Sequence, residues 1–358
     1  MKGLILSGGK GTRLRPLTHT SAKQLVPVAN KPVLFYGIEA MEQAGITDIG
    51  IIIAPETGAE IEAAAGTGEQ FGVQLTYIKQ DAPSGLAHAV LTAEDYLGDS
   101  PFVMYLGDNL LREGIVDLVR KFRDEGPDAL ILLTAVDDPQ NYGVAELNEN
   151  GGVARLVEKP SPSETDSDLA LVGVYMFTRA IFDAARSIEP SARGELEITD
   201  AIQALIDRGL RVDRHKVDGW WKDTGQVEDM LDANQLILDR IERRIAGEHD
   251  DGSQIEGRVV LEAGAVLKRA RVRGPAIIGK GSSIVDAYIG PYTAIGEDVE
   301  IEHAELENSI VLSGSSICDF PARIDASLIG YNVNIRRRRD LPMAHRFVVG
   351  DNADVQIL

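Results

Sequence analysis

Near its start the chain carries glycines and cations in a spacing that could bind phosphate. Residues 8–13 hold three glycines followed by Thr12 and Arg13, and Lys23 comes shortly after them. Glycines let backbone N–H groups approach a phosphate, and an arginine can bind two phosphate oxygens at once. The spacing lacks the third glycine of a dinucleotide-binding loop, and Lys10 is not followed by the serine or threonine of a P-loop. The residues therefore predict a phosphate site of another kind.

The overall charge restricts the ligand of such a site to small anions. The chain has 358 residues, with 36 Lys and Arg against 56 Asp and Glu, which gives a net charge of −20. Such a chain repels nucleic acid, so we expect small-molecule substrates and no nucleic-acid partner. The single cysteine, Cys318, excludes a disulfide framework and a cysteine-rich zinc site. The longest apolar stretch, residues 49–54, is too short to cross a membrane, and no segment is typical of a signal peptide. We therefore expect a cytoplasmic protein without a membrane partner.

Up to about residue 240, segments typical of strands alternate with segments typical of helices. The expected strands are residues 2–6, 48–54, 75–79, 101–106 and 129–136. The expected helices are residues 31–44, 56–69, 85–97 and 115–124. This alternation predicts an α/β, Rossmann-like mixed sheet that is mainly parallel and has helices on both faces. Ligands of such sheets bind beyond the carboxyl ends of the strands, where residues 8–13 and 107–109 both lie.

A second pattern begins after a break at residues 247–253. We expect a catalytic domain over residues 1–247, including a linking helix over about 226–247, and a second domain over 253–358. In the second domain apolar residues recur every six positions, with one slip and a less regular end: Val260, Val266, Val272, Ile278, Ile284, Ile289, Ile295, Ile301, Val311, Ile317, Ile329 and Ile335. This period is typical of a left-handed parallel β-helix, in which each six-residue unit forms one side of a triangular coil. We expect four to five coils over residues 255–337, and ordinary antiparallel strands are the alternative.

An ordered set of motifs in the first 240 residues resembles the sugar-1-phosphate nucleotidylyltransferases. The motifs are GGKGTRLRPLT (8–18), AKQLVP (22–27), QDAPSGLA (80–87), YLGDN (105–109), NYGV (141–144), VEKP (157–160), RGELEITD (193–200) and WKDTG (221–225). Each motif is weak alone, but the ordered set is specific. Within this family the chain is most similar to the long form of the glucose-1-phosphate thymidylyltransferases, which carries a β-helix after the catalytic domain.

The resemblance implies an enzyme that condenses glucose 1-phosphate with dTTP to give dTDP-glucose and pyrophosphate. The attacking phosphate is ionised near neutral pH, so catalysis would come from positioning and charge neutralisation, with Mg²⁺ as the cofactor. The alternatives are a UTP-dependent uridylyltransferase, a hexosamine 1-phosphate substrate, and a non-catalytic regulatory subunit with the same fold. A bifunctional acetyltransferase is disfavoured, because His303 is the only histidine within the repeat.

The resemblance also assigns roles to individual residues. The catalytic residues would be Arg13, Lys23, Lys159 and Asp108. The nucleotide would be bound by Leu6, Gly8, Gly9, Gly11, Thr12, Arg13, Lys23, Gln24, Gln80, Gly85 and Asp108. The sugar phosphate would be bound by Gly143, Glu158, Lys159, Leu171, Arg193 and Trp221. Mg²⁺ would be held by Asp108 and Asp223.

Each of these residue types also has a structural alternative. Asp108 could cap a helix and Asp223 could sit in a turn. Trp221 could belong to the core. Lys159 could be a solvated cation, and Arg193 could neutralise the nearby glutamates.

Two further features concern the second domain. Four consecutive arginines at 336–339 could bind an anionic effector or partner, but a solvated end of the β-helix is favoured. The chain is expected to form a homo-oligomer through the β-helix, the catalytic domain or both, because open strand edges favour association.

Overall fold

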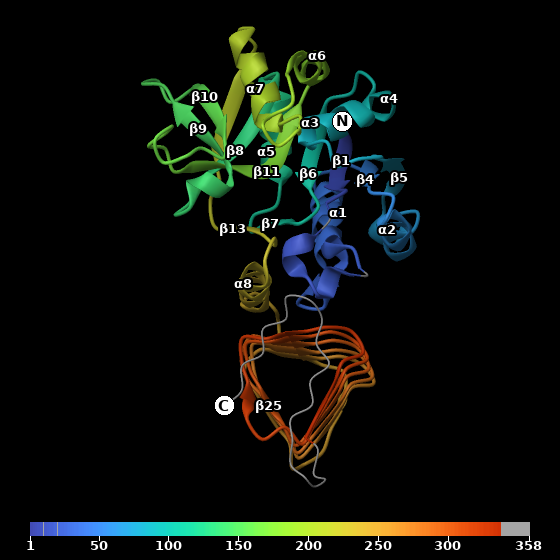
Figure 1. Cartoon of the computed structure of the whole chain (residues 1–358). Helices are drawn as coiled ribbons and strands as arrows, with labels where there is room; N and C mark the ends of the chain where they lie inside the picture. Colours follow the sequence, from blue (N-terminus) through green and yellow to red (C-terminus); the bar gives the residue numbers. More distant parts are fainter. Residues whose placement is uncertain (10, 20, 338–358) are drawn as a thin grey trace. The chain divides into compact units, whose positions relative to one another are not determined.

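The computed structural model describes residues 1–9, 11–19 and 21–337 (Figure 1). The chain forms two compact units, each made of several stretches of sequence. The first unit comprises Met1–Lys10, Ser21–Leu25 and Val33–Asp223. The second comprises Gly11–Thr20, Val26–Pro32 and Thr224–Leu358. Within the described ranges, every helix is too short or too polar to cross a membrane.

A nine-stranded mixed sheet forms the centre of the first unit. Its strands are β1 (Lys2–Ser7), β4 (Asp48–Ile53), β5 (Gln74–Lys79), β6 (Phe102–Leu106), β8 (Ala129–Ala135), β9 (Gly143–Leu147), β10 (Val153–Glu158), β11 (Leu169–Phe177) and β12 (Val212–Lys216). Seven of them follow the order β10-β9-β11-β6-β1-β4-β5, and β8 pairs with both β11 and β12. The strands around β1 are parallel, whereas β11 runs antiparallel to its neighbours. The expected Rossmann-like sheet is therefore confirmed.

Helices cover both faces of this sheet because the strands are apolar on both sides. In β1, Leu4 and Leu6 join one core cluster, and Ile5 joins the other. One face is covered by α3 (Leu86–Thr92), α4 (Glu94–Leu97), α6 (Ala180–Ser187) and α7 (Ile198–Asp207). The opposite face is covered by α1 (Val33–Gln43), α2 (Gly58–Ala65) and α5 (Val116–Glu125).

Short elements join these larger ones. Two helices are shorter than expected: α2 ends before Gly66, whose φ is +59°, and the helix expected over 85–97 is divided at Ala93. The 3₁₀ turns are η1 (Thr12–Leu14), η2 (Leu17–His19), η3 (Lys23–Leu25), η4 (Glu69–Phe71) and η5 (Pro139–Asn141). Two small antiparallel pairs are β2 (Pro27–Val28) with β3 (Lys31–Pro32), and β7 (Asn109–Leu111) with β13 (Trp221–Asp223).

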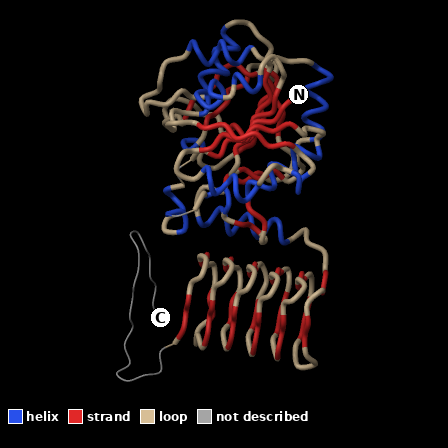
Figure 2. The backbone as a smooth tube through the Cα atoms, turned by 90° about the vertical axis from the view of Figure 1, so that its right-hand side faces the viewer, coloured by secondary structure: helices blue, strands red, loops and turns tan. Residues whose placement is uncertain are grey.

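The second unit contains α8 (Val227–Leu238) and a left-handed parallel β-helix, which is triangular when seen along its axis in Figure 1 and a stack of coils in Figure 2. The first of its three sheets comprises β14 (Arg244–Ile245), β17 (Val259–Leu261), β20 (Ala276–Ile278), β23 (Thr293–Ile295), β26 (Ile310–Val311) and β29 (Leu328–Ile329). The second comprises β15 (Glu248–His249), β18 (Val266–Lys268), β21 (Ser283–Val285), β24 (Glu300–Glu302), β27 (Ser316–Cys318) and β30 (Asn334–Arg336). The third comprises β16 (Gln254–Glu256), β19 (Arg271–Arg273), β22 (Tyr288–Ile289), β25 (Glu305–Leu306) and β28 (Arg323–Ile324).

The start of the β-helix lies earlier in the chain than the sequence predicts. The expected linking helix over 226–247 is too long, because α8 ends at Leu238 and β14 already pairs with β17. Ile245 continues the helical spacing in the sequence, yet its side chain packs against the interior of the β-helix. Of the expected second domain, residues 338–358 lie outside the described residues. Arg336 and Arg337 are exposed, and Arg338 and Arg339 lie outside the described residues.

The inward-facing register also differs from the six-residue spacing at its first two positions. Leu261 pairs with Ile278 and then Ile295, so each of these coils takes 17 residues (261 to 278), not 18. Val260 and Val266 therefore do not belong to the inward column. The interior cluster contains their neighbours Leu261 and Leu267 instead. The sides of a coil are unequal in length, and a strict period of six cannot capture that.

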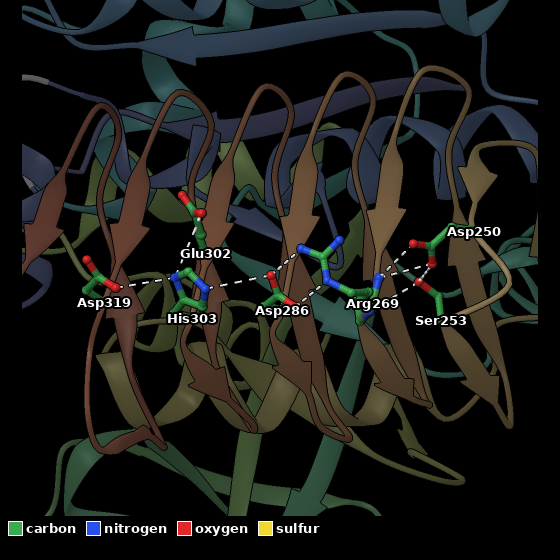
Figure 3. A network of polar contacts seen from close by, with 8 residues as sticks. Asp250, Ser253, Arg269, Asp286, Glu302, His303 and Asp319 are labelled. Carbon is green, nitrogen blue, oxygen red and sulfur yellow. Dashed lines mark hydrogen bonds and ion pairs between the residues drawn. The ribbon is translucent and has the colours of Figure 1, made fainter.

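A column of charged residues runs along one corner of the β-helix (Figure 3). Arg269, Asp286, His303 and Asp319 occupy successive coils and share left-handed φ angles of 47° to 54°. The Arg269 guanidinium donates to Asp286, whose carboxylate lies 3.7 Å from Nε2 of His303. Nδ1 of His303 lies 3.3 Å from Asp319. We call these four residues the corner ladder; exposed pairs of this kind each contribute little to stability.

The 17-residue register predicts that adjacent positions respond differently to truncation. Leu267→Ala should lower the free energy of unfolding by about 2–5 kcal/mol, because it leaves a cavity in the interior. Val266→Ala, at an outward position, should change it by less than about 1 kcal/mol. Denaturant titrations of both variants measure the difference, and equal losses would contradict the register.

Candidate functional site

A largely buried ion pair lies at the carboxyl end of β6, where ligands of such sheets bind. Lys23 in η3 and Asp108, two residues after β6, form this pair, and each side chain is 16% exposed. Burial alone would raise the pKa of the Asp108 carboxyl. The ammonium of Lys23 and the amide of Asn109 outweigh burial, so the pKa lies below its ordinary value. The site therefore holds an ionised carboxylate and a fixed cation in direct contact.

Asn109 positions this ion pair and was not identified from the sequence as a site residue. Its Nδ2 donates to Asp108 over 3.0 Å, while its Oδ1 accepts from the indole of Trp221 over 2.6 Å and from the amide of Gly173 over 3.2 Å. The side chain is nearly fully buried, so these bonds fix it in one orientation. The available signal was its place directly after Asp108 in the YLGDN motif.

The pairing of β7 with β13 brings the second expected metal ligand to the same place. Asp223 lies opposite Asn109 in the antiparallel register, and Asp108 is the residue before Asn109. The backbones of Asp108 and Asp223 are therefore both near the end of β6, although 115 positions separate them in the sequence (108 to 223). Their oxygens suit Mg²⁺, which commonly takes one or two protein carboxylates and fills its other positions with water or phosphate. No cluster of three or more metal-ligating side chains occurs among residues 1–9, 11–19 and 21–337.

Beside these carboxylates lies a cavity of about 130 Å³. Five of the expected site residues line it: Gly143, Glu158, Leu171, Trp221 and Asp223. The Trp221 indole donates to Asn109, and its ring packs edge-on against Tyr142 at 5.4 Å, which fits the structural role considered for it. The structure thus joins most of the expected sugar-phosphate residues to one of the expected metal ligands.

Glu158 is held at the wall of this cavity by neighbours on both sides. Its Oε1 accepts from Arg193 over 2.9 Å, and its Oε2 accepts a short hydrogen bond from the Thr199 hydroxyl. A Cβ atom at Gly143 would lie 3.1 Å from Oε2 of Glu158, so the glycine makes room for the carboxylate. Thr199 lies within the RGELEITD motif, but the sequence did not single it out.

The two cations expected at the sugar phosphate differ in their surroundings. Arg193 also donates to Glu197 over 2.8 Å and lies 3.7 Å from Glu195, so it neutralises the nearby glutamates as the structural alternative states. Lys159 is exposed and has a left-handed φ of +45°, which is uncommon outside glycine. Such backbone conformations cluster at functional sites, where they aim a side chain.

The glycine turn after β1 approaches the side chains expected to contact the nucleotide. A Cβ at Gly8 would lie 3.2 Å from Oε1 of Gln80, and a Cβ at Gly9 would lie 3.8 Å from Nε2 of Gln24. Nε2 of Gln80 lies 2.9 Å from His88 and 3.4 Å from the carbonyl oxygen of Gly85. These amides therefore lie close to the glycine turn.

Two of the expected nucleotide residues have structural tasks of their own. Leu6 is buried in the core cluster of one sheet face. Gly85 has a φ of +104°, and a Cβ there would lie 2.3 Å from the carbonyl oxygen of Leu196. The close approach that requires glycine at position 85 is thus the approach to Leu196.

Gln24 leaves a polar atom unsatisfied. Its side chain is 2% exposed, and Oε1 has no hydrogen-bond partner within the described part of the chain. An unpaired buried acceptor is costly, so such an atom points to a missing donor.

The rest of the glycine motif belongs to the other compact unit. Gly11, Thr12 and Arg13 lie in the stretch Gly11–Thr20, which groups with α8 and the β-helix. Gly11 adopts a φ of +59°, and the Arg13 side chain is exposed.

A larger cavity, of about 750 Å³, lies on the β-helix between the corner ladder and the third sheet. Its lining includes Arg269, Arg271 and Arg323, each of which pairs with a carboxylate of the β-helix. None of the residues expected to act in catalysis or binding lines it. We assign this cavity no role in binding the nucleotide or the sugar phosphate.

Comparison with known proteins matches most of the chain. The sequence pattern of the nucleotidyl transferase family matches residues 2–240. A glucose-1-phosphate thymidylyltransferase of Streptomyces antibioticus is 56% identical over 358 residues, covering 100% of this chain and 99% of the relative. A low-salt glycan biosynthesis nucleotidyltransferase of Haloferax volcanii is 48% identical over 360 residues, covering all of both chains.

A solved structure resembles the catalytic part. It is a protein from Bacillus anthracis described as a glucose-1-phosphate thymidylyltransferase, in complex with a sucrose. It is 37% identical, has a TM-score of 0.62, and covers 66% of this chain and 94% of its own.

The hydrogen bonds of Asn109 predict a large effect of its removal. Asn109→Ala should lower the free energy of unfolding by about 2–4 kcal/mol, because the Trp221 indole and the Gly173 amide would lose their acceptor. Asn141→Ala is the matched control, since Asn141 is an exposed asparagine of the same cavity, and we expect a change within about 0.5 kcal/mol. Equal, small effects in denaturant titrations would show that Asn109 does not hold the site together.

Proposed function

We propose that this chain, which belongs to the nucleotidyl transferase family, condenses glucose 1-phosphate with dTTP to give dTDP-glucose and pyrophosphate. The observation that carries the proposal is the contact of Lys23 with Asp108 at the end of β6. The pairing of β7 with β13 supports it, because it brings Asp223 opposite Asn109 and to the cavity lined by Glu158. The name of the Streptomyces antibioticus relative, which matches over the full length, supports the choice of substrates.

The reaction requires charge neutralisation more than proton transfer. An oxygen of the sugar phosphate attacks the α-phosphorus of the triphosphate in line, and the bond to the bridging oxygen of the β-phosphate breaks. A phosphate monoester has its second pKa near 6, so this oxygen is already ionised at neutral pH and needs no general base. Catalysis then depends on holding the two phosphates in line and on offsetting the charge that collects between them.

The cations of the site have distinct proposed tasks. Lys23, fixed by Asp108, stabilises charge on the α-phosphate and on the leaving pyrophosphate. Arg13 binds the triphosphate, since a guanidinium can grip two phosphate oxygens. Lys159 and Arg193 hold and aim the sugar phosphate. For Lys159 the support is its exposed side chain and left-handed backbone. For Arg193 the support is its hydrogen bond to Glu158, which lines the cavity.

Asp108 and Asp223 are the proposed ligands of Mg²⁺. When bound, this ion would neutralise part of the charge on the phosphates. The low pKa of Asp108 keeps its carboxylate ionised and ready to bind a cation at neutral pH.

The nucleotide is proposed to bind along the glycine turn, with Leu6, Gly8, Gly9, Gly11, Thr12, Gln24, Gln80 and Gly85 around it. The unsatisfied Oε1 of Gln24 supports this placement, because a nucleotide would supply the N–H or O–H donor that this oxygen lacks. The amide of Gln80, close to Gly8, can pair with the edge of a pyrimidine base.

Glucose is proposed to bind in the 130 Å³ cavity. Glu158 would accept hydrogen bonds from the sugar hydroxyls, because Thr199 and Arg193 hold its carboxylate in place. Gly143 and Leu171 give the sugar room and an apolar contact, and Trp221 forms a wall.

We also propose that the enzyme is a cytoplasmic homo-oligomer. The free thiol of Cys318 fits a reducing compartment, and the open ends of a parallel β-helix offer strand edges to another subunit. Light scattering that returned the monomer mass of 38.7 kDa would contradict the oligomer.

Replacing Arg13 or Asp108 should strongly lower turnover without unfolding the chain. Arg13→Ala and Asp108→Asn should each lower kcat by at least about 100-fold, because each removes a group that neutralises or orients phosphate. Arg15→Ala is the control, since Arg15 is also exposed in the same loop and has no proposed role. Near-normal turnover in either variant, with circular dichroism unchanged, would refute the assigned role.

The substrate choice can be tested in one matrix of assays. Pyrophosphate release should be fastest with dTTP and glucose 1-phosphate when dTTP and UTP are each combined with glucose 1-phosphate and N-acetylglucosamine 1-phosphate. A higher kcat/KM with UTP would favour the uridylyltransferase alternative. No release with any pair would favour the non-catalytic subunit.

A further inference from the structure

The stretch that carries Arg13 is held by residues from the other end of the sequence. Gly11–Thr20 and Val26–Pro32 form one compact unit with Thr224–Leu358, although Met1–Lys10 and Ser21–Leu25 on either side belong to the catalytic unit. The phosphate-binding motif is therefore divided between the two units, and its second half is packed by α8 and the β-helix. The β-helix therefore packs part of the glycine motif, a role separate from the subunit association proposed for it.

The first part of this packing is apolar. Leu17, four residues after Arg13, packs on a buried cluster formed by Leu231 of α8 with Ala294, Ile310 and Leu312 of the β-helix. Ala294, Ile310 and Leu312 are at most 2% exposed, although they lie on the outer side of the first sheet. Their burial therefore depends on α8 and on the loop that carries Leu17. A Cβ at Gly330 would lie 3.2 Å from Cδ2 of Leu17, so the fit is close on this side too.

The second part is a set of hydrogen bonds at the tip of the β2–β3 hairpin. Ala29 and Asn30 form its turn with left-handed φ angles of 47° and 62°. The Ala29 amide donates to Oδ1 of Asn234 over 3.0 Å, and Nδ2 of Asn30 donates to the carbonyl oxygen of Ile295 over 2.6 Å. Nδ2 of Asn234, which is 1% exposed, donates in turn to Tyr292 over 2.9 Å. One buried amide of α8 thus joins the hairpin to the β-helix.

The loop is short and internally closed, so holding Leu17 also holds Arg13. The Thr18 hydroxyl donates to the carbonyl oxygen of Gly11 over 2.6 Å, and the Leu14 amide donates to the same oxygen over 3.1 Å. The Leu14 side chain is fully buried. Arg13 therefore lies on a turn whose two ends are tied together and whose far side is packed against the β-helix.

We infer that Leu17 and Asn234 are positioning residues, through which α8 and the β-helix hold the Arg13 loop in its nucleotide-binding conformation. The inference rests on the proposed role of Arg13 in binding the triphosphate. A loop that is already ordered loses less conformational freedom when the ligand binds, and this raises affinity without a new contact to the ligand. Leu17 and Asn234 act through the loop and do not touch the substrate.

Truncating Leu17 in the full-length protein tests the inference. Leu17→Ala should lower kcat/KM for the nucleoside triphosphate about tenfold while the KM for the sugar 1-phosphate changes less than about twofold, because only the nucleotide loop loses its anchor. Leu17→Met keeps the apolar volume and should restore most of the loss. Leu312→Ala removes the partner leucine on the β-helix and should reproduce the effect, and the double variant Leu17→Ala/Leu312→Ala should lose less than the sum of the two.

A second readout does not depend on activity. Arg13 is exposed, so trypsin can cleave after it, and the fragment that begins at Leu14 is identified by its mass. Leu17→Ala should speed this cleavage in the ligand-free protein by at least about fivefold, because cleavage follows the population of the open loop. Proteolysis is compared at a temperature well below the unfolding transition of every variant.

Two controls separate the explanations. Leu267→Ala damages the interior of the β-helix on another side, so it should lower stability more than Leu17→Ala does but leave kinetics and cleavage after Arg13 unchanged. Arg13→Ala tests the proposed function by itself: normal turnover there would refute the role of Arg13, whatever the loop does. Wild-type cleavage in Leu17→Ala, or an equal kinetic effect of Leu267→Ala, would overturn the inference.

Discussion

An ionised carboxylate and an ammonium are in contact at the end of β6, and much of the catalytic unit serves to keep them there. A chain with a net charge of −20 repels phosphates unless cations are fixed at the point of reaction. Lys23 is fixed by Asp108, and Asp108 is oriented by Asn109. Breaking such a pair leaves an uncompensated charge, and Asp108 is held by Asn109 as well as by its attraction to Lys23.

The support for this pair comes from segments that meet only in the folded state. Asn109 accepts from Trp221 of β13 and from Gly173, where the register of β11 is irregular. A Cβ at Gly173 would lie 2.5 Å from Oδ1 of Asn109, so only glycine lets the strand come this close. The irregularity in β11 is thus a means of aiming one backbone amide at the residue that orients Asp108.

How much the sequence could predict depended on whether a residue acts locally or through a distant partner. The alternation of strand and helix segments predicted the sheet, and the YLGDN motif placed Asp108 at a strand end. Glu158, which the resemblance assigns to the sugar site, does line the cavity. The sequence did not identify Asn109 and Thr199, because their roles depend on side-chain hydrogen bonds to residues that are distant in the sequence. Ile245 misled for a related reason: an apolar residue at helical spacing can equally face the interior of a β-helix, and only pairing with β17 distinguishes the two.

The boundary between the units explains why a linear division of this chain is incomplete. Apolar residues on the outer side of the first β-helix sheet, such as Ile310 and Leu312, would face water if the chain from α8 onward were considered alone. They are covered by α8 and by Leu17, which lies within the glycine motif over residues 8–18. The same apolar contacts therefore bury the outer side of the β-helix and pack the loop that carries Leu17. A substitution on this face of the β-helix should affect both the β-helix and the loop. A sequence divided at residue 247 places the two halves of that contact in different domains and hides the dependence.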